Sequence, residues 1–289
     1  MESARELVAG LRKRGVDSRL VDPSPSTNPI GWVGTEDRGV PVADMDWAVN
    51  ADVVVSHSGY DATPIENTSQ PIVHVCHGRP RSTFIGERDG GTPVYSYHYR
   101  LNADPRIKAV VTFWPEHKPY HEVMFPDKPV HVVQSSVDLE AWSNEGLKGY
   151  QFGGKQGRIN VVCTDAWRDD VDPFCAVNAF ALWARDINGA KLHIYGNTSN
   201  LRGWSALFKR ISDDGNMGEI KGWVGGLDNV YRAADFMITP HTIDVRSVRE
   251  SMACGCPVVR VNSDLSGFRT QIAAARDEDR GVIRLRAEA

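Results

Sequence analysis

Residues 234–259 are the stretch that most constrains how this chain can fold. Residues 236–239 are a short apolar run of strand length, and Pro240 ends the run because proline cannot donate a hydrogen bond to a sheet. A helical pattern starts near Val245 and stops at Gly255, and the valines that follow predict another strand. Such a strand–loop–helix–strand unit is typical of a parallel α/β sheet, which binds ligands at the carboxyl ends of its strands.

The loop and helix start that follow this first strand carry the residues that we expect to bind an anion. A helix N-terminus offers backbone N–H groups and the positive end of a dipole, and Arg246, Ser247 and Arg249 add donors beside it. Glu250 lies about one turn further in, where an ionised carboxylate can accept two hydrogen bonds from a ribose diol. The alternative is that Arg246, Arg249 and Glu250 form only the solvated face of a surface helix.

The segment from Glu250 to Val259, Glu-Ser-Met-Ala-Cys-Gly-Cys-Pro-Val-Val, resembles the Glu-Ala-Met-Ala-Cys-Gly-x-Pro-Val-Val signature of GT-B glycosyltransferases of the family 4 type. Members of that family are retaining enzymes that use nucleotide sugars, so the resemblance implies that Glu250 holds the donor ribose. The sequence departs from the family upstream, because Thr242 stands in place of a first glutamate, and Ile243 and Val245 in place of glycines. We expect Thr242 and Val245 at the donor site, along a backbone path that differs from that of the family.

Histidines follow two apolar runs in the first half of the chain. Residues 71–77 end in a histidine and a glycine, which is similar to the strand-His-Gly element of the family, and the resemblance implies that His77 faces the donor sugar. Arg79 and Arg81 follow, and we place them on the acceptor side as positive charges. His57 resembles a second histidine of the family. Without the resemblance, a histidine at a strand end is more often a hydrogen-bonded structural residue.

The diphosphate and the base of the donor need further partners. The family clamps the diphosphate with an arginine and a lysine, but those positions fall on Thr164 and Asp169 in this sequence. We expect Arg168 to replace the lysine and Arg246 to supply the missing charge from the other loop. Trp223 falls in the short strand near which the family packs its base, so this side chain either stacks on the base or belongs to the core.

Neither a metal site nor a disulfide is predicted. Asp170 and Asp172 invite a metal interpretation, but carboxylates in the first turn of a helix are favourable with its dipole and need no metal. The five cysteines are odd in number and lack metal-finger spacing, which indicates buried free thiols rather than a catalytic cysteine. We therefore predict no cofactor, with a nucleotide-diphosphate sugar as the donor substrate.

The whole chain has the composition of a globular α/β protein. Its 289 residues suffice for about two domains, and 41% hydrophobic and 24% charged residues are ordinary values. A net charge of −4 gives no general attraction to nucleic acid. No apolar run is long enough to span a membrane and no signal peptide is recognisable, so we expect a cytoplasmic protein without a membrane span.

Alternating strand and helix patterns predict an α/β fold with two Rossmann-like domains that face a central cleft, as in the GT-B arrangement. We assign residues 1–141 to an acceptor-side domain, 142–157 to a linker and 158–289 to a nucleotide-sugar-binding domain. The predicted helices are residues 2–14, 115–124, 172–184, 201–211 and 227–233. Besides 236–239, the predicted strands include residues 16–21, 52–57, 71–77, 108–113, 130–133, 159–163, 191–195 and 220–224.

These expectations combine into a glycosyltransferase that moves a hexosyl or pentosyl group from a nucleotide-diphosphate sugar, with retention implied by the resemblance. His77 and Arg246 are the predicted catalytic residues. The acceptor stays open between a glycan, a small molecule and a modified base in DNA. Two alternatives stay open as well: an epimerase of GT-B shape, and a nucleotide-binding module without catalysis, since Thr242 replaces the first glutamate of the family.

Overall fold

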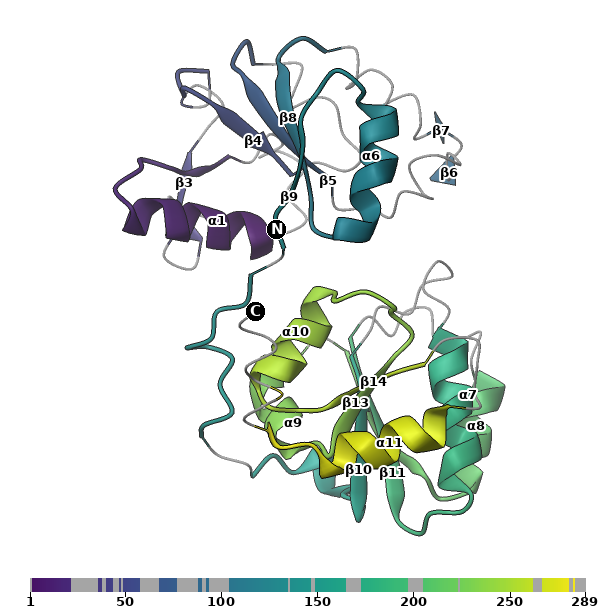
Figure 1. The fold of residues 1–289 in the computed structure, drawn as a ribbon. Coiled ribbons are helices and arrows are strands. Elements are labelled where there is room, and N and C mark those ends of the chain that lie inside the picture. Colours follow the sequence, from purple (N-terminus) through teal and green to yellow (C-terminus); the bar gives the residue numbers. More distant parts are fainter. Residues whose placement is uncertain are drawn as a thin grey trace. The chain divides into compact units, whose positions relative to one another are not determined.

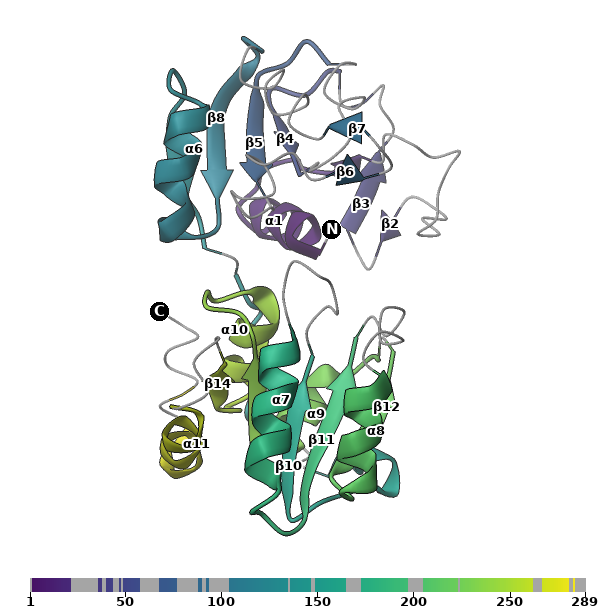
Figure 2. The same ribbon diagram turned by 90° about the vertical axis from the view of Figure 1, so that its right-hand side faces the viewer.

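The protein is seen here in a computed structural model, drawn in Figures 1 and 2. It divides into two compact units, Met1–Ser136 and Val137–Ala289, and each unit is described by itself. The residues that the structure describes are 2–21, 36–37, 40–43, 47, 49–57, 68–76, 88–89, 92–93, 104–134, 136–146, 149–164, 173–196, 205–222, 224–261, 267–280 and 283.

A parallel sheet of four strands in the order β4-β5-β8-β9 forms the centre of the N-terminal unit. The predicted helix over 115–124 is a short 3-10 turn, η2 (Pro115–His117), followed by α6 (Lys118–Met124), which packs against β8 and β9. Apolar side chains of the sheet and Phe125 form one core cluster. The strands are β4 (Val54–Ser56), β5 (Ile72–Cys76), β8 (Ile107–Thr112) and β9 (Val130–Val132).

The N-terminal unit begins with helix α1 (Glu2–Lys13), as the sequence predicts. Val8 of this helix packs against Leu20 and Val40, which belong to a small three-stranded sheet in the order β1-β3-β2. The strand predicted over 16–21 is confined to its last two residues. The short strands of this region are β1 (Leu20–Val21), β2 (Glu36–Asp37), β3 (Val40–Ala43) and the antiparallel pair β6 (Arg88–Asp89) and β7 (Thr92–Pro93).

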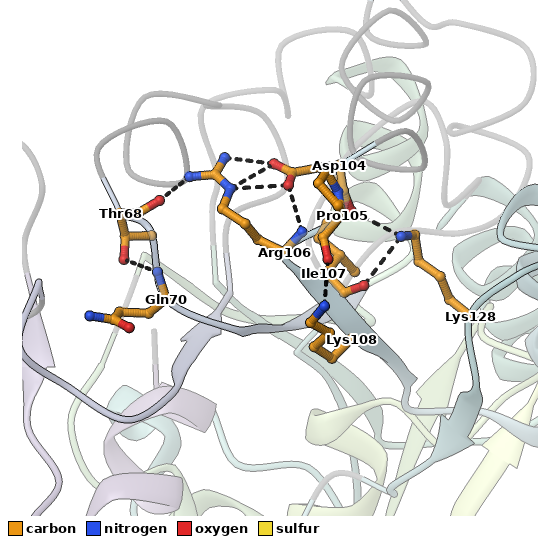
Figure 3. A network of polar contacts seen from close by, with 8 residues as sticks. All are labelled: Thr68, Gln70, Asp104, Pro105, Arg106, Ile107, Lys108 and Lys128. Atoms are coloured by element: carbon orange, nitrogen blue, oxygen red, sulfur yellow. Dashed lines mark hydrogen bonds and ion pairs between the residues drawn. The ribbon is translucent and has the colours of Figure 1, made fainter.

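A polar cluster braces the amino ends of β5, β8 and β9 (Figure 3). Arg106 forms an ion pair with Asp104 at 2.6 Å and donates to the carbonyl of Thr68, and Lys128 Nζ donates to the Asp104 carbonyl at 3.0 Å and to the Ile107 carbonyl at 3.2 Å. Hydrogen bonds from Arg106 hold the pKa of Asp104 below its ordinary value. We call these residues the Arg106 cluster; they join three chain segments before the strands begin.

A parallel sheet of five strands in the order β12-β11-β10-β13-β14 forms the C-terminal unit. The chain starts in the middle with β10, builds outward to β12, and then crosses back to place β13 on the other side of β10. Such a reversal is the point where open α/β sheets bind ligands. The elements are β10 (Ile159–Cys163), α7 (Pro173–Ala184), β11 (Ala190–Tyr195), α8 (Ser205–Asp213), β12 (Met217–Lys221), α9 (Leu227–Ala233), β13 (Phe236–Thr239), α10 (Arg246–Ala253), β14 (Val258–Arg260) and α11 (Phe268–Asp277).

Helices cover both faces of this sheet, with α7 and α8 on one side and α9 and α10 on the other (Figure 1). Alternate residues of a strand point to opposite faces, so Val161 packs with the α7 and α8 side chains while Val162 packs with those of α9 and α10. All strand pairs within the sheet are parallel. The predicted α/β fold class, with a parallel sheet in each of two bodies, is confirmed.

Strand β12 corrects the prediction over 220–224, since it runs from Met217 to Lys221. Its centre holds Glu219, a buried carboxylate that accepts hydrogen bonds from Tyr195 Oη at 2.7 Å and Tyr150 Oη at 3.0 Å and forms an ion pair with Lys221. Burial raises the pKa of Glu219, but the contacts with Lys221, Tyr195 and Tyr150 outweigh it and the net pKa lies below the ordinary value.

Residues 142–157, predicted as a linker, include side chains that pack against the C-terminal sheet. Phe152, in the 3-10 turn η3 (Phe152–Gly154), stacks on His193 with ring centroids 4.0 Å apart. His193 Nδ1 accepts a hydrogen bond from the Glu219 backbone N–H at 3.0 Å, and its Nε2 lies 3.1 Å from Asn160 Oδ1. Burial lowers the pKa of His193 to about 4, so the ring is neutral at pH 7. The predicted domain limits stay a prediction.

Candidate functional site

The carboxyl ends of β10 and β13 meet where the strand order of the C-terminal sheet reverses. Thr164 follows β10, and its Oγ1 lies 2.8 Å from the phenolic oxygen of Tyr231 in α9. Thr239 ends β13, and its Oγ1 accepts a hydrogen bond from the backbone N–H of His241 at 3.2 Å. We take this edge of the sheet, with the loop 240–245 and the start of α10, as the candidate site.

Helix α10 begins at this edge with its dipole directed toward the loop. Val245 is the N-cap, its backbone is extended, and among the described residues no side chain caps the helix. The first N–H groups of a helix have no acceptor within the helix, so such an end favours an anion. No acidic residue lies in the first turn, and Ser247 is half-buried there.

Arg246 and Glu250 form an ion pair one turn apart on α10. Arg246 Nε donates to Glu250 Oε1 at 2.6 Å, and the two side chains are 26% and 10% exposed. Glu250 therefore does not lie on a solvated helix face, which rejects that alternative for this residue. A partner of this kind compensates the charge of a buried carboxylate, and carboxylate oxygens are acceptors for hydroxyl hydrogen bonds.

The other end of α10 fixes the helix against the sheet. Gly255 has a positive φ of 70° and donates its N–H to the Met252 carbonyl, while the Cys256 N–H bonds to the Ser251 carbonyl at 3.0 Å. These bonds close the helix as the sequence predicts at Gly255. Since Val248 is fully buried on the same helix, the position of the Arg246–Glu250 pair is set by the packing of the core.

Arg260 is a site residue that the sequence analysis did not single out. Strand β14 pairs in register with β13 so that Arg260 lies beside Thr239. Its Nη1 donates to the carbonyls of His241 at 3.1 Å and Ile243 at 2.9 Å, and its Nη2 forms an ion pair with Asp244. The signal in the sequence is an arginine that interrupts a run of valines at the carboxyl end of a strand.

The described site thus brings together five of the predicted donor-site residues. Thr242 is exposed in the loop that Arg260 holds. His57 lies directly after β4, half-buried, in the N-terminal unit. These positions do not test the roles predicted for Thr242 and His57, which stay predictions. His77, Arg79, Arg81, Arg168 and Trp223 lie outside the described residues. The five that come together are Thr242, Val245, Arg246, Ser247 and Glu250.

The buried cysteines are thiols. Cys76, Cys163, Cys254 and Cys256 are buried without disulfides, and burial raises the pKa of Cys76 and of Cys254 to about 12. A thiol with such a pKa is a poor nucleophile at pH 7.

The described residues offer neither a metal-binding cluster nor a helix suited to a membrane. No group of three or more His, Cys, Asp or Glu side chains is arranged there to hold a metal ion, and Asp170 and Asp172 lie outside those residues. None of the helices in the described part of the chain combines the length and the apolar character that crossing a membrane requires.

Comparison with known proteins yields matches in structure and none in sequence. No protein-family model and no curated protein matches the chain. TarM shares 15% identity with a TM-score of 0.64, and the match covers 81% of this chain and 51% of TarM, so this chain spans about half of that protein. Sucrose-phosphate synthase from Thermosynechococcus elongatus shares 12% identity with a TM-score of 0.71, and the match covers 98% and 87% of the two chains.

A third match is the Anabaena protein HepE in complex with UDP and glucose. It shares 12% identity with a TM-score of 0.61, over 86% of this chain and 85% of HepE. These identities are too low to carry residue roles across, but the shared architecture extends over most of this chain. The chain therefore has a two-body α/β fold that matches solved structures of GT-B glycosyltransferases.

Proposed function

We propose that this chain is a nucleotide-sugar-dependent glycosyltransferase that acts with retention. The observation that carries the proposal is the pair of half-buried Arg246 and buried Glu250, which lies at the helix start beside the reversal of the strand order. An anion site next to a buried carboxylate suits a diphosphate joined to a ribose. Similar folds have been solved with such ligands: HepE with UDP-glucose, and the pneumococcal O-GlcNAc transferase GtfA with UDP and GlcNAc.

The chemistry follows from where charge develops. As the bond between the sugar and the diphosphate breaks, negative charge grows on the leaving phosphate, and Arg246 together with the start of α10 stabilises it. Glu250 accepts hydrogen bonds from the ribose hydroxyls and so fixes the position of the donor. The remaining roles are those predicted from the sequence: His77 facing the sugar, Arg168 and Trp223 at the diphosphate and base, and Arg79, Arg81 and His57 toward the acceptor.

A binding screen tests the donor site. We expect UDP, GDP or ADP, or one of their glucose conjugates, to raise the melting temperature of the full chain, and Glu250→Ala and Arg246→Ala to abolish the shift. Arg210→Ala is the matched control, because Arg210 also pairs with a carboxylate four residues away, but in the last turn of α8. An unchanged shift in both site variants would refute the proposal.

Product analysis separates transfer from its alternatives. Incubation of the full chain with the stabilising nucleotide sugar and an acceptor panel of glycans, small molecules and DNA with modified bases should release nucleoside diphosphate and glycosylated product. An isomerised sugar without transfer would indicate the epimerase. Binding without turnover would indicate the nucleotide-binding module that the substitution at Thr242 leaves open.

A further inference from the structure

We propose that Arg260 is the positioning residue of the diphosphate site: it holds the loop 241–244 in the shape that presents the start of α10 to the phosphates. The inference rests on the proposed function. It concerns a residue that neither touches the substrate nor belongs to the Glu250–Val259 signature.

The contacts of Arg260 span the loop. One guanidinium donates to the carbonyls of His241 and Ile243 and pairs with the Asp244 carboxylate, so a single side chain holds three acceptors within four residues. The guanidinium group of an arginine is rigid and planar, and Arg260 belongs to β14, which pairs with β13. Arg260 therefore fixes the loop relative to the sheet. A lysine has the charge but lacks this fork.

The same contacts matter for charge. Asp244 lies two residues before the first residue of α10, where an acidic side chain would repel a bound phosphate. The ion pair with Arg260 neutralises that charge. Two effects therefore act in the same direction, since the guanidinium shapes the loop and lowers the negative potential beside the anion site.

The ribose end of the donor should depend much less on Arg260. Glu250 is carried by α10, whose position is set by the burial of Val248 and by the closure at Gly255. Loss of Arg260 leaves those contacts in place. Binding of a nucleoside diphosphate and binding of the corresponding nucleoside should therefore respond differently to substitution of Arg260.

The test compares UDP, by isothermal titration, with uridine, by NMR titration, on the full chain. We expect Arg260→Lys and Arg260→Ala to weaken UDP binding about tenfold and to leave uridine binding within about twofold of wild type. The control is Arg269→Ala, which removes an arginine paired with a distant aspartate, Asp186, in the same unit; UDP binding should not change. Circular dichroism checks folding, and the lysine variant decides if the alanine variant unfolds.

The outcomes separate the two claims. If wild type binds none of UDP, GDP and ADP, this inference and the proposed function are both overturned. If it binds GDP or ADP in place of UDP, the same comparison is made with that nucleotide and its nucleoside. If wild type binds UDP and Glu250→Ala does not, while the folded Arg260 variants bind UDP as wild type does, only the inference is wrong. An equal loss of UDP and uridine binding in folded Arg260→Lys would also overturn it, because that pattern indicates a general structural role.

Discussion

Arg106 in the N-terminal unit and Arg260 in the C-terminal unit make nearly the same contacts. Each forms an ion pair with an aspartate, Asp104 or Asp244, and each donates to the backbone of another segment: Arg106 to one carbonyl and Arg260 to two. Arg106 lies at the amino ends of its parallel strands (Figure 3), whereas Arg260 lies at the carboxyl end. Open α/β sheets bind ligands at the carboxyl ends of their strands, so we infer that the same chemistry braces one unit and shapes the proposed binding loop in the other.

The largest expected effect is a difference between the two units in how their stability depends on pH. His193 has a pKa of about 4 when folded and about 6.5 when unfolded. The unfolded chain therefore binds more protons, and the C-terminal unit should lose about 3 kcal/mol of stability as the pH falls through this range. The Arg106 cluster should be unaffected there, because the pKa of Asp104 lies below its ordinary value.

Urea unfolding and hydrogen exchange at about pH 7 and about pH 4.5 measure this difference. Peptides from β11 should lose protection while peptides from β8 keep it. His193→Gln, which retains one donor and one acceptor, should remove most of the pH dependence. Equal pH dependence in both units would contradict the assignment to His193.

Arg106→Ala should have the next largest effect, on stability alone. The substitution leaves the Asp104 carboxylate, only 15% exposed, without its main partner, and we expect a loss of about 2 kcal/mol in the unfolding free energy of the N-terminal unit. Nucleotide binding should stay at the wild-type value. Weaker UDP binding in a folded Arg106→Ala protein would break the contrast with Arg260.

Glu250→Gln tests the same comparison on the carboxylate partners of the arginines. The amide keeps the shape but loses the charge and one of the strong acceptors, so UDP binding should weaken about tenfold, equivalent to about 1.4 kcal/mol. The matched variant in the Arg106 cluster is Asp104→Asn, which should alter stability and not binding. Titration calorimetry on both proteins gives the comparison, and equal affinities would count against Glu250 as the ribose ligand.

The smallest predicted effect concerns two glycines. Gly255→Ala should destabilise the C-terminal unit by about 1 kcal/mol, because φ is 70° and a Cβ would lie 3.1 Å from Arg280. Gly10→Ala in α1 should instead stabilise the N-terminal unit slightly, since nothing lies within 4 Å of a Cβ there. Thermal unfolding distinguishes the two, and a Gly255→Ala protein as stable as wild type or more stable would show that the turn after α10 is not under this constraint.

Local sequence patterns predicted the elements that follow a regular alternation of apolar and polar residues or a short apolar run. The limits of β10, α9 and β13 agree with the prediction, because short apolar runs and regular periodicity define them. Strand β12 was misplaced because its central Glu219 looks incompatible with a buried strand. The two hydroxyls that satisfy it come from residues 69 and 24 positions earlier in the chain, which no local pattern reveals.

The candidate site was predictable only in part for a related reason. Glu250 and Arg246 stand in a recognisable pattern and lie one turn apart on the same helix, as the sequence predicts, but their ion pair was not predicted. Arg260 escaped notice because two of its three partners are backbone carbonyls, which every residue possesses and which leave no mark in a sequence. Its importance appears only when the register of β13 and β14 is known.

The packing of Tyr150 and Phe152 onto the C-terminal sheet has a practical consequence for dissecting the protein. An expression fragment that begins at Arg158 would lack Tyr150, a hydroxyl donor to Glu219, and Phe152, which stacks on His193. The Glu219 carboxylate would then have one hydrogen-bond donor fewer. A fragment that starts at Val137 keeps both, so an expression fragment of the C-terminal unit should include residues 137–157.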